Sequence, residues 1–270
     1  MSLAHVDGSS RADDPVGVFD SGVGGLSVLN ALRETLPHER FVYFADTAHA
    51  PYGERGDAFV AERSAAVARE LIDAHRIKAL VVACNTATAA AIHRLRADHP
   101  ALPVVGVEPA LKPAVALSRT GRIAVLATRV TVGSRKFQAL LASLAGQAAF
   151  SIVACDGLAG AIEGADEARI AALCERHLAT AGRFGDGDGE IDTLVLGCTH
   201  YPFVADELRR RTGPTVRFID TGAPVAQQTR RLLGQAGTLR ADGAGELRLL
   251  SSGAPEALDA AAARWLTVPA

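Results

Sequence analysis

Two of the four cysteines, Cys84 and Cys198, occupy matching places in the sequence. Each follows a short apolar segment, in Ala-Cys-Asn-Thr-Ala-Thr and Gly-Cys-Thr-His-Tyr-Pro, and precedes residues that suit the start of a helix. A lone cysteine there is most often a small buried hydrophobic residue, but a matched pair favours functional thiols. A helix start would also lower the pKa of Cys84. Two thiols on opposite sides of a substrate could remove a proton from one face of a carbon atom and return one to the other.

Other residues near these thiols could assist them. His200 lies two residues after Cys198 and could orient or acidify that thiol, although a histidine here could equally lie at the surface or cap a helix. The remaining cysteines, Cys155 and Cys174, have no comparable neighbours. We therefore assign those two to packing.

The sequence suggests no anchor for a cofactor or a metal. The only lysines are Lys78, Lys112 and Lys136, and none lies in a context that suggests a Schiff base with pyridoxal. The cysteines form no Cys-x-x-Cys pair, so a structural zinc site is not expected. We therefore expect proton transfer without a cofactor and without a metal.

A glycine-rich segment, Asp-Ser-Gly-Val-Gly-Gly at 20–25, follows the first apolar segment. One interpretation is a dinucleotide-binding loop with Asp46 as the acid that holds the ribose. Two features argue against it, because Ser27 stands where the third glycine would be and Asp20 would repel a pyrophosphate. The simpler interpretation is a tight connection between a strand and a helix.

Short apolar segments alternate with stretches of helical periodicity, which is typical of parallel sheets covered by helices on both faces. The candidate strands are Val16–Asp20, Phe41–Asp46, Ala79–Cys84, Val104–Val107, Ile123–Ala127, Phe150–Ala154, Thr193–Gly197 and Val216–Asp220. Ligands of such sheets bind beyond the carboxyl ends of the strands, which is where Cys84 and Cys198 fall.

The order of these features predicts an α/β fold of two similar parallel-sheet lobes, with an active-site cleft between them that receives one thiol from each lobe. We expect a disordered tail at 1–14, a first lobe made of 15–109 plus 221–270, and a second lobe at 110–220. The C-terminal part should add a helix, a strand near Leu247–Leu250 and a last helix to Leu266.

Composition limits the partners and the compartment. The chain has 270 residues and a net charge of −2, so we expect no nucleic-acid partner. Its N-terminus lacks the features of a signal peptide, and no apolar stretch approaches the ~20 residues of a membrane span. We expect a cytoplasmic protein with free thiols and no membrane partner.

Several sequence blocks resemble those of the glutamate racemase family, within the aspartate/glutamate racemase superfamily. They are Phe-Asp-Ser-Gly-Val-Gly-Gly-Leu at 19–26, Ala-Asp-Thr-Ala-His-Ala-Pro-Tyr-Gly at 45–53, Cys-Asn-Thr-Ala-Thr at 84–88, Gly-Val-Glu-Pro-Ala at 106–110, Gly-Cys-Thr-His-Tyr-Pro at 197–202 and Asp-Thr-Gly at 220–222. They follow the family's order, and together they are a far more specific signal than any one of them.

The resemblance implies a pyridoxal-independent, metal-free enzyme that interconverts L- and D-glutamate and supplies D-glutamate for peptidoglycan. In that case Cys84 and Cys198 match the catalytic cysteines, and Asp20 and His200 match residues that assist them. Glu163 matches a further assisting acid, in a block that departs from the usual proline-containing pattern. The substrate-binding residues carried over, besides Asp20 and His200, are Ser21, Pro51, Tyr52, Gly53, Asn85, Thr86, Thr128, Thr131 and Thr199. Family members often form dimers, so the resemblance also implies a homodimer.

Three alternatives remain open from the sequence. An aspartate racemase would have a second motif resembling Gly-Cys-Thr-Glu, whereas this chain has His200. A non-catalytic two-lobed amino-acid receptor would explain a cleft but not two matched thiols. A cysteine hydrolase could use Cys198 as nucleophile and His200 as base, and Cys84 would then be dispensable.

Overall fold

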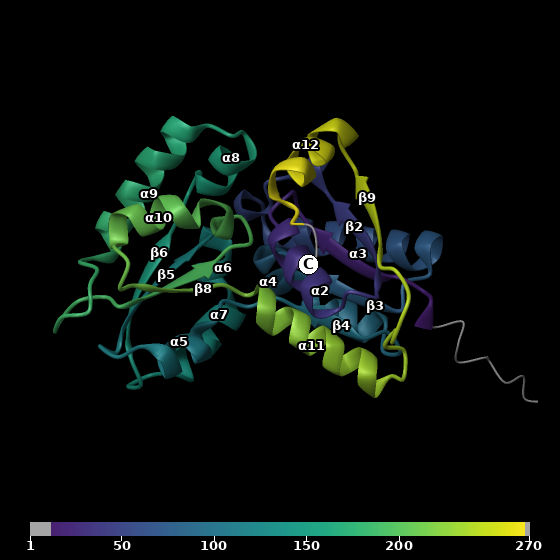
Figure 1. The fold of residues 1–270 in the computed structure, drawn as a ribbon, viewed down its shortest axis with the longest axis horizontal. Helices are drawn as coiled ribbons and strands as arrows, with labels where there is room; N and C mark the ends of the chain where they lie inside the picture. Colours follow the sequence, from purple (N-terminus) through teal and green to yellow (C-terminus); the bar gives the residue numbers. More distant parts are fainter. Residues whose placement is uncertain (1–11, 268–270) are drawn as a thin grey trace, which may run out of the picture.

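The structure, a computed structural model, describes residues 12–267, and the predicted tail at 1–14 lies mostly outside them. It contains two parallel sheets whose helices lie on both faces (Figure 1). The predicted fold class, two parallel-sheet α/β lobes, is therefore confirmed.

The first sheet has five strands in the order β4-β3-β1-β2-β9. Their bounds are β1 Val16–Asp20, β2 Arg40–Ala45, β3 Ala79–Val82, β4 Val104–Gly106 and β9 Glu246–Ser251. Val18 in β1 pairs with Tyr43 on one side and Val81 on the other, and all the pairings are parallel. The strand β9 pairs with β2, so the C-terminal part of the chain returns to the first sheet.

The second sheet has four strands in the order β6-β5-β7-β8. Their bounds are β5 Arg122–Ala127, β6 Ala149–Ala154, β7 Thr193–Gly197 and β8 Arg217–Ile219. Ala127 at the end of β5 pairs with Ala154 of β6 and with Gly197 of β7. The residues that follow these three strands therefore leave the sheet along one edge.

Helices connect successive strands, as the alternating sequence pattern predicts. They are α2 Leu26–Thr35, α3 Asp57–His75, α4 Asn85–Asp98, α5 Leu111–Leu117, α6 Arg129–Gly133, α7 Arg135–Ala142, α8 Leu158–Glu163, α9 Glu167–Ala181, α10 Ala205–Thr212, α11 Gly222–Gln235 and α12 Pro255–Trp265. Three short 3-10 turns, η1 Thr47–His49, η2 Tyr52–Glu54 and η3 Tyr201–Val204, lie in the longer connections.

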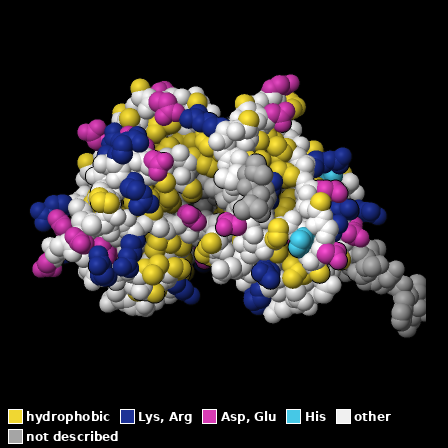
Figure 2. All heavy atoms as spheres, in the orientation of Figure 1, with side chains coloured by type: hydrophobic (Ala, Val, Ile, Leu, Met, Phe, Trp, Pro, Cys, Tyr) yellow, Lys and Arg dark blue, Asp and Glu magenta, His cyan; other side chains and the backbone are white. Residues whose placement is uncertain are grey.

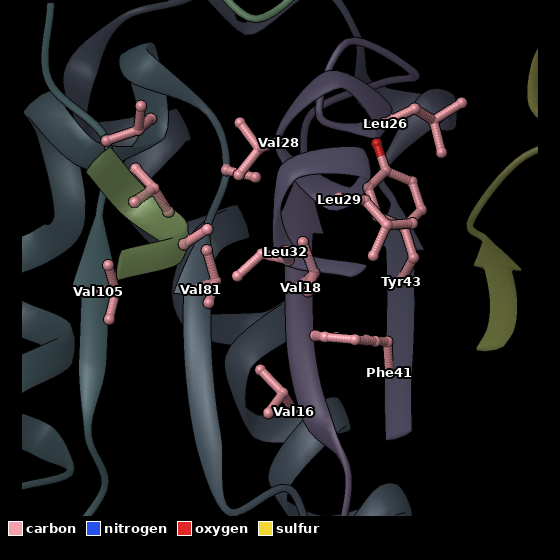
Figure 3. Packing of buried hydrophobic residues seen from close by; sticks show 14 of the residues in the cluster. Val16, Val18, Leu26, Val28, Leu29, Leu32, Phe41, Tyr43, Val81 and Val105 are labelled. Atoms are coloured by element: carbon pink, nitrogen blue, oxygen red, sulfur yellow. The ribbon is translucent and has the colours of Figure 1, made fainter. Parts of the chain in front are cut away.

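Alternation along the strands divides the core of the first sheet into two layers. Val18 and Val81 face one side, where Leu29 and Leu32 of α2 pack against them (Figure 3). Phe19 faces the other side and belongs to the layer formed with α3 and α4. Because both faces are covered, the central strands β1, β2 and β3 are continuous apolar runs in their buried parts, and Asp20, Asp46 and Cys84 stand at or just after their ends.

The surface carries both signs of charge. On the face shown in Figure 2, Lys and Arg side chains are interspersed with Asp and Glu side chains on both halves of the molecule. Within residues 12–267, no helix is long and apolar enough to cross a membrane.

Candidate active site

One pocket is lined by residues that follow strands of both sheets, as the predicted cleft requires. Cys84 follows β3 of the first sheet, and Cys198 follows β7 of the second. The lining residues are Ser21, Pro51, Tyr52, Gly53, Glu54, Cys84, Asn85, Thr86, Thr128, Arg129, Cys155, Asp156, Gly157, Ala159, Gly160, Glu163, Cys198, Thr199 and His200. The structure thus brings both candidate thiols to a single pocket.

The Cys84 thiol caps the N-terminus of α4. Its Sγ accepts a hydrogen bond from the Ala87 amide at 3.4 Å and lies 3.5 Å from the Ser21 hydroxyl. The residue is buried, and this burial together with the nearby charge of Asp20 raises the pKa of the Cys84 thiol to about 12. The amide at the helix start does lower this pKa, as expected, but desolvation outweighs it and the net shift is upward.

The Cys198 thiol begins a chain of three groups. Its Sγ lies 3.6 Å from His200 Nδ1, and His200 Nε2 lies 2.8 Å from Glu163 Oε1. Burial alone would lower the pKa of His200, but its bonds to Cys198 and Glu163 raise it well above the ordinary value. Burial alone would raise the pKa of Glu163, but the bond from His200 lowers it. These shifts favour an imidazolium next to Cys198, which can stabilise a thiolate or return a proton to it.

Asp20 lies under the pocket rather than on its wall. It is fully buried and accepts hydrogen bonds from the Gly22 amide at 2.7 Å and the Thr199 hydroxyl at 3.2 Å. Burial raises the pKa of Asp20 to about 6, with His200 opposing the rise. This carboxyl group raises the pKa of Cys84 yet bonds to the residue after Cys198, so it serves both sides of the pocket.

The glycine-rich segment does more than connect β1 to α2. A Cβ atom at Gly22 would collide with the Glu163 carboxylate, and one at Gly24 would collide with the ring of His200. The Val23 amide donates to Glu163 Oε1 at 3.3 Å, the oxygen atom that also contacts His200. The glycines are therefore needed because this loop of the first sheet packs directly on the assisting groups of the second.

One polar side chain of the pocket lining, Asn85, has no hydrogen-bond partner among residues 12–267. Asn85 is buried, and within the described part of the chain neither its side-chain nitrogen nor its side-chain oxygen has a hydrogen-bond partner. A buried polar group of this kind is costly unless a ligand or water satisfies it. The Thr86 hydroxyl lies 3.2 Å from that of Thr128, which donates to the hydroxyl of Thr131 at 2.9 Å. Thr131 does not line this pocket and acts on it only through Thr128.

A further wall comes from the connection after β2, which contains η1 and η2. Pro51, Tyr52 and Gly53 of this segment line the pocket. The Tyr52 hydroxyl donates to Asp46 Oδ2 at 2.6 Å. A Cβ at Gly53 would lie 3.3 Å from the side chain of Thr128, so this wall reaches the second sheet.

Sequence reasoning missed one part of the lining. It is made of residues that follow β5 and β6, with Glu54 from η2: Glu54, Arg129, Cys155, Asp156, Gly157, Ala159 and Gly160. Cys155 was assigned to packing, but its buried side chain belongs both to the core and to the pocket wall. Its place directly after β6 was the signal that could have found it. Cys174 lies in the core, as expected.

The arrangement suits proton transfer at two faces of one small molecule. The pocket presents two thiols from different sheets and an imidazole–carboxylate pair beside one of them, and the buried Asp20 carboxyl group lies under the pocket. Within residues 12–267, no group of three or more His, Cys, Asp or Glu side chains is placed to hold a metal ion.

Comparison with known proteins agrees with this geometry. A model of the Asp/Glu/Hydantoin racemase family matches residues 23–229. A glutamate racemase from Pseudomonas syringae pv. tomato is 45% identical over 248 residues, which cover 90% of this chain and 87% of that protein. The structure of a glutamate racemase from Bacillus anthracis is 30% identical, with a TM-score of 0.83 over 95% of each chain. A glutamate racemase from Escherichia coli, solved with L-glutamate and the activator UDP-MurNAc-ala, is 31% identical, with a TM-score of 0.79 over 93% of this chain and 95% of that one. This chain belongs to the Asp/Glu/Hydantoin racemase family.

Proposed function

We propose that this protein is a glutamate racemase that interconverts L- and D-glutamate with two cysteines and no cofactor. The observation that carries the proposal is that Cys84 and Cys198, from different sheets, line one pocket. Relatives that share 45% of their residues with most of this chain are glutamate racemases, and the Escherichia coli relative binds L-glutamate. Both findings support glutamate as the substrate.

In the proposed mechanism, one cysteine thiolate removes the α-proton of glutamate while the other thiol supplies a proton to the opposite face. His200, held by Glu163, takes the proton of Cys198 or returns it. Cys84 is a protonated thiol at neutral pH because its pKa is raised to about 12. Cys84 is therefore ready to act as the acid for the enantiomer that Cys198 deprotonates. In the reverse direction Asp20, which lies under the pocket and acts electrostatically on Cys84, accepts the Cys84 proton. The notion that Asp20 holds the substrate's ammonium group directly does not fit its full burial.

The remaining pocket residues would bind the substrate. The unpartnered amide of Asn85 can donate to a carboxylate and accept from an ammonium group at the same time. We assign substrate contacts to His200 and to Ser21, Pro51, Tyr52, Gly53, Asn85, Thr86, Thr128 and Thr199, which line the pocket. Asp20 and Thr131 do not line it, so we assign them indirect roles, Asp20 through Thr199 and Thr131 through Thr128.

A cysteine hydrolase is the second candidate, because Cys198, His200 and Glu163 stand in the order thiol, imidazole, carboxylate. In a hydrolase Cys84 would have no part in the reaction. Its position in the same pocket as Cys198, with Asp20 close enough to shift its pKa, favours the racemase. An aspartate racemase remains the alternative within the family.

We further propose the biological setting that the family resemblance implies. The product D-glutamate would serve peptidoglycan synthesis, and the enzyme would act in the cytoplasm as a homodimer. The boundaries of its two lobes would fall near 109/110 and 220/221, with the C-terminal part completing the first lobe.

The direct test is incubation of the purified protein with L-glutamate in deuterated water. We expect the optical rotation to decay to zero while deuterium enters the α-position, with EDTA having no effect. Parallel incubation with L-aspartate should give much slower exchange. Comparable turnover of both amino acids would contradict the glutamate assignment, and loss of activity on chelation would contradict the metal-free mechanism.

A further inference from the structure

Two buried aspartates lie side by side at the carboxyl ends of β1 and β2, and their surroundings differ. Asp20 ends β1 and Asp46 directly follows β2, and the Asp46 amide donates to the Asp20 carbonyl oxygen at 3.0 Å. Both are fully buried. Within residues 12–267 the Asp20 carboxyl group accepts from one amide and one hydroxyl, and burial raises its pKa to about 6. Two like residues in neighbouring positions can thus serve different roles, set by their partners.

Asp46 is held by a full set of donors. The guanidinium of Arg63, on α3, donates to both carboxylate oxygens, with Nη2 at 2.8 Å and Nε at 3.1 Å. The Tyr52 hydroxyl lies at 2.6 Å and His49 Nδ1 at 2.9 Å. Burial opposes ionisation, but the bonds from Arg63 and Tyr52 keep the pKa of Asp46 near 2. Asp46 is therefore a fixed anion and not a proton carrier.

The segment that Asp46 anchors is held by apolar packing at Tyr52 and by few polar contacts. The Tyr52 ring is buried in the core of the first sheet, with its centroid 6.2 Å from that of Phe19, so a polar contact of its hydroxyl fixes where that ring lies. The segment consists of the 3-10 turns η1 and η2, too short to be stable by themselves. Apart from Asp46, its polar ties run to the end of β9, where the Thr47 hydroxyl lies 2.7 Å from that of Ser251 and the Ala48 amide donates to the Ser252 hydroxyl at 3.1 Å. These ties hold the start of the segment. Tyr52 lies in the pocket wall itself, and the polar partner of its hydroxyl among residues 12–267 is Asp46.

We propose that Asp46 and Arg63 are positioning residues that fix the wall made of Pro51, Tyr52 and Gly53, and thereby set the length of substrate that the pocket accepts. The Tyr52 hydroxyl is then a tether, since it donates its proton to Asp46 at 2.6 Å, while the rest of the residue lines the pocket. Gly53 stands against Thr128 of the second sheet, so a shift of the tether changes the distance between the wall and the thiols. The inference rests on the proposed racemase function.

The chain supplies a matched control for the loss of a buried ionic contact. Glu39 and Lys78 form an ion pair at 2.6 Å whose side chains are each 1% exposed. Glu39 directly precedes β2, whereas Asp46 directly follows it, so the control pair lies at the opposite end of the same strand. Neither residue lines the pocket.

The experiment compares Tyr52→Phe, Arg63→Gln, Arg63→Lys and Glu39→Gln with the wild-type protein, at a temperature well below the Tm of each. KM and kcat are measured with L-glutamate, and Ki is measured for 2-aminoadipate, a competitive probe one methylene longer. We expect Tyr52→Phe and Arg63→Gln to raise KM for glutamate about 10-fold while kcat stays within about threefold of the wild-type value. Because a loosened wall should accept the longer molecule more readily, the ratio of the aminoadipate Ki to the glutamate KM should fall. Arg63→Lys should recover part of each change.

Glu39→Gln should lower Tm but leave KM and the inhibitor ratio unchanged. The inference is overturned if Tyr52→Phe and Arg63→Gln lower only Tm, or if Glu39→Gln changes KM and the ratio as much as they do. Should Arg63→Gln not fold, Tyr52→Phe decides alone, because it removes a single hydroxyl group. A wild-type protein that does not racemise glutamate would instead overturn the proposed function, and the inference with it.

Discussion

At the scale of single residues, the two thiols share a pocket but not an environment. The Cys198 thiol lies 3.6 Å from the imidazole of His200, which is itself held by the Glu163 carboxylate. The Cys84 thiol has the Ser21 hydroxyl and the Ala87 amide as neighbours, and burial together with the charge of Asp20 raises its pKa. The proton of Cys198 can therefore pass to a neighbouring base, and that of Cys84 has no such neighbour except Asp20. This asymmetry predicts that the two proton transfers respond differently to loss of their helpers.

We predict opposite isotope effects for His200→Asn and Asp20→Asn. Loss of His200 should slow proton transfer at Cys198 by about 10²-fold or more, because the thiol loses its neighbouring acid and base. The α-deuterium isotope effect on kcat/KM should then rise for the enantiomer that Cys198 deprotonates and fall for the other. Loss of Asp20 should reverse this pattern through Cys84.

The measurement uses α-deuterated L- and D-glutamate with each variant. The equilibrium constant fixes the ratio of kcat/KM for the two directions, so a variant cannot change that ratio. A difference between the two proton-transfer steps can therefore be seen only in the isotope effects. The same isotope pattern in both variants would mean that Asp20 and His200 do not serve separate thiols.

At the scale of elements, the loop between β1 and α2 is shaped by what it touches on the other sheet. The Val23 amide of the loop donates to Glu163, and Ser27, in the first turn of α2, donates its hydroxyl to the Thr199 carbonyl oxygen at 2.7 Å. Side chains at Gly22 and Gly24 would occupy the space of the assisting acid and imidazole. The loop therefore holds the groups that serve Cys198, although it belongs to the sheet that carries Cys84.

Gly24→Ala tests this role of the loop. The added methyl group must displace His200 or Thr199, so we expect kcat to fall about 10²-fold while the protein stays folded. The control is Gly234→Ala on α11, where a Cβ has no neighbour within 4 Å and should leave the activity unchanged. Steady-state kinetics of both variants measure the loss of kcat, and thermal unfolding shows whether each variant is folded. An active Gly24→Ala protein would show that the close approach is not needed for catalysis.

Local sequence patterns predicted the elements and the thiols but not the energetics of the site. Apolar runs that end in polar residues marked the strands, and the strand-end rule placed Cys84 and Cys198 in the pocket. The pKa of Cys84 could not be predicted, because desolvation depends on packing from both sheets. The unpartnered amide of Asn85 is likewise visible only once every neighbour is in place.

At the scale of the whole molecule, contacts between the two halves must hold the thiols at a fixed separation. Trp265 at the end of α12 stacks on Phe203 of η3, with ring centroids 4.4 Å apart and planes 5° apart. The Trp265 carbonyl oxygen accepts from the Asn30 side chain of α2 at 2.8 Å. The last helix therefore ties the core of the first sheet to the turn that follows Cys198 and His200.

A double-mutant cycle on Phe203→Ala and Trp265→Ala measures this tie. We expect a coupling free energy of about 1 kcal/mol in the free energy of unfolding, which is typical of a stacked aromatic pair. Each single variant should also raise KM for glutamate, since the turn after Cys198 loses its support. Strictly additive effects on unfolding would show that the stack contributes nothing beyond its separate side chains.

The most direct test of the account is racemisation by the single-thiol variants Cys84→Ser and Cys198→Ser, with Cys174→Ser as a control for a buried cysteine in the core. A proton carrier is needed on each face of the α-carbon, so we predict that each of the first two loses activity by about 10³-fold or more, while the control stays close to wild type. Racemisation by Cys84→Ser at the wild-type rate would contradict the two-thiol mechanism.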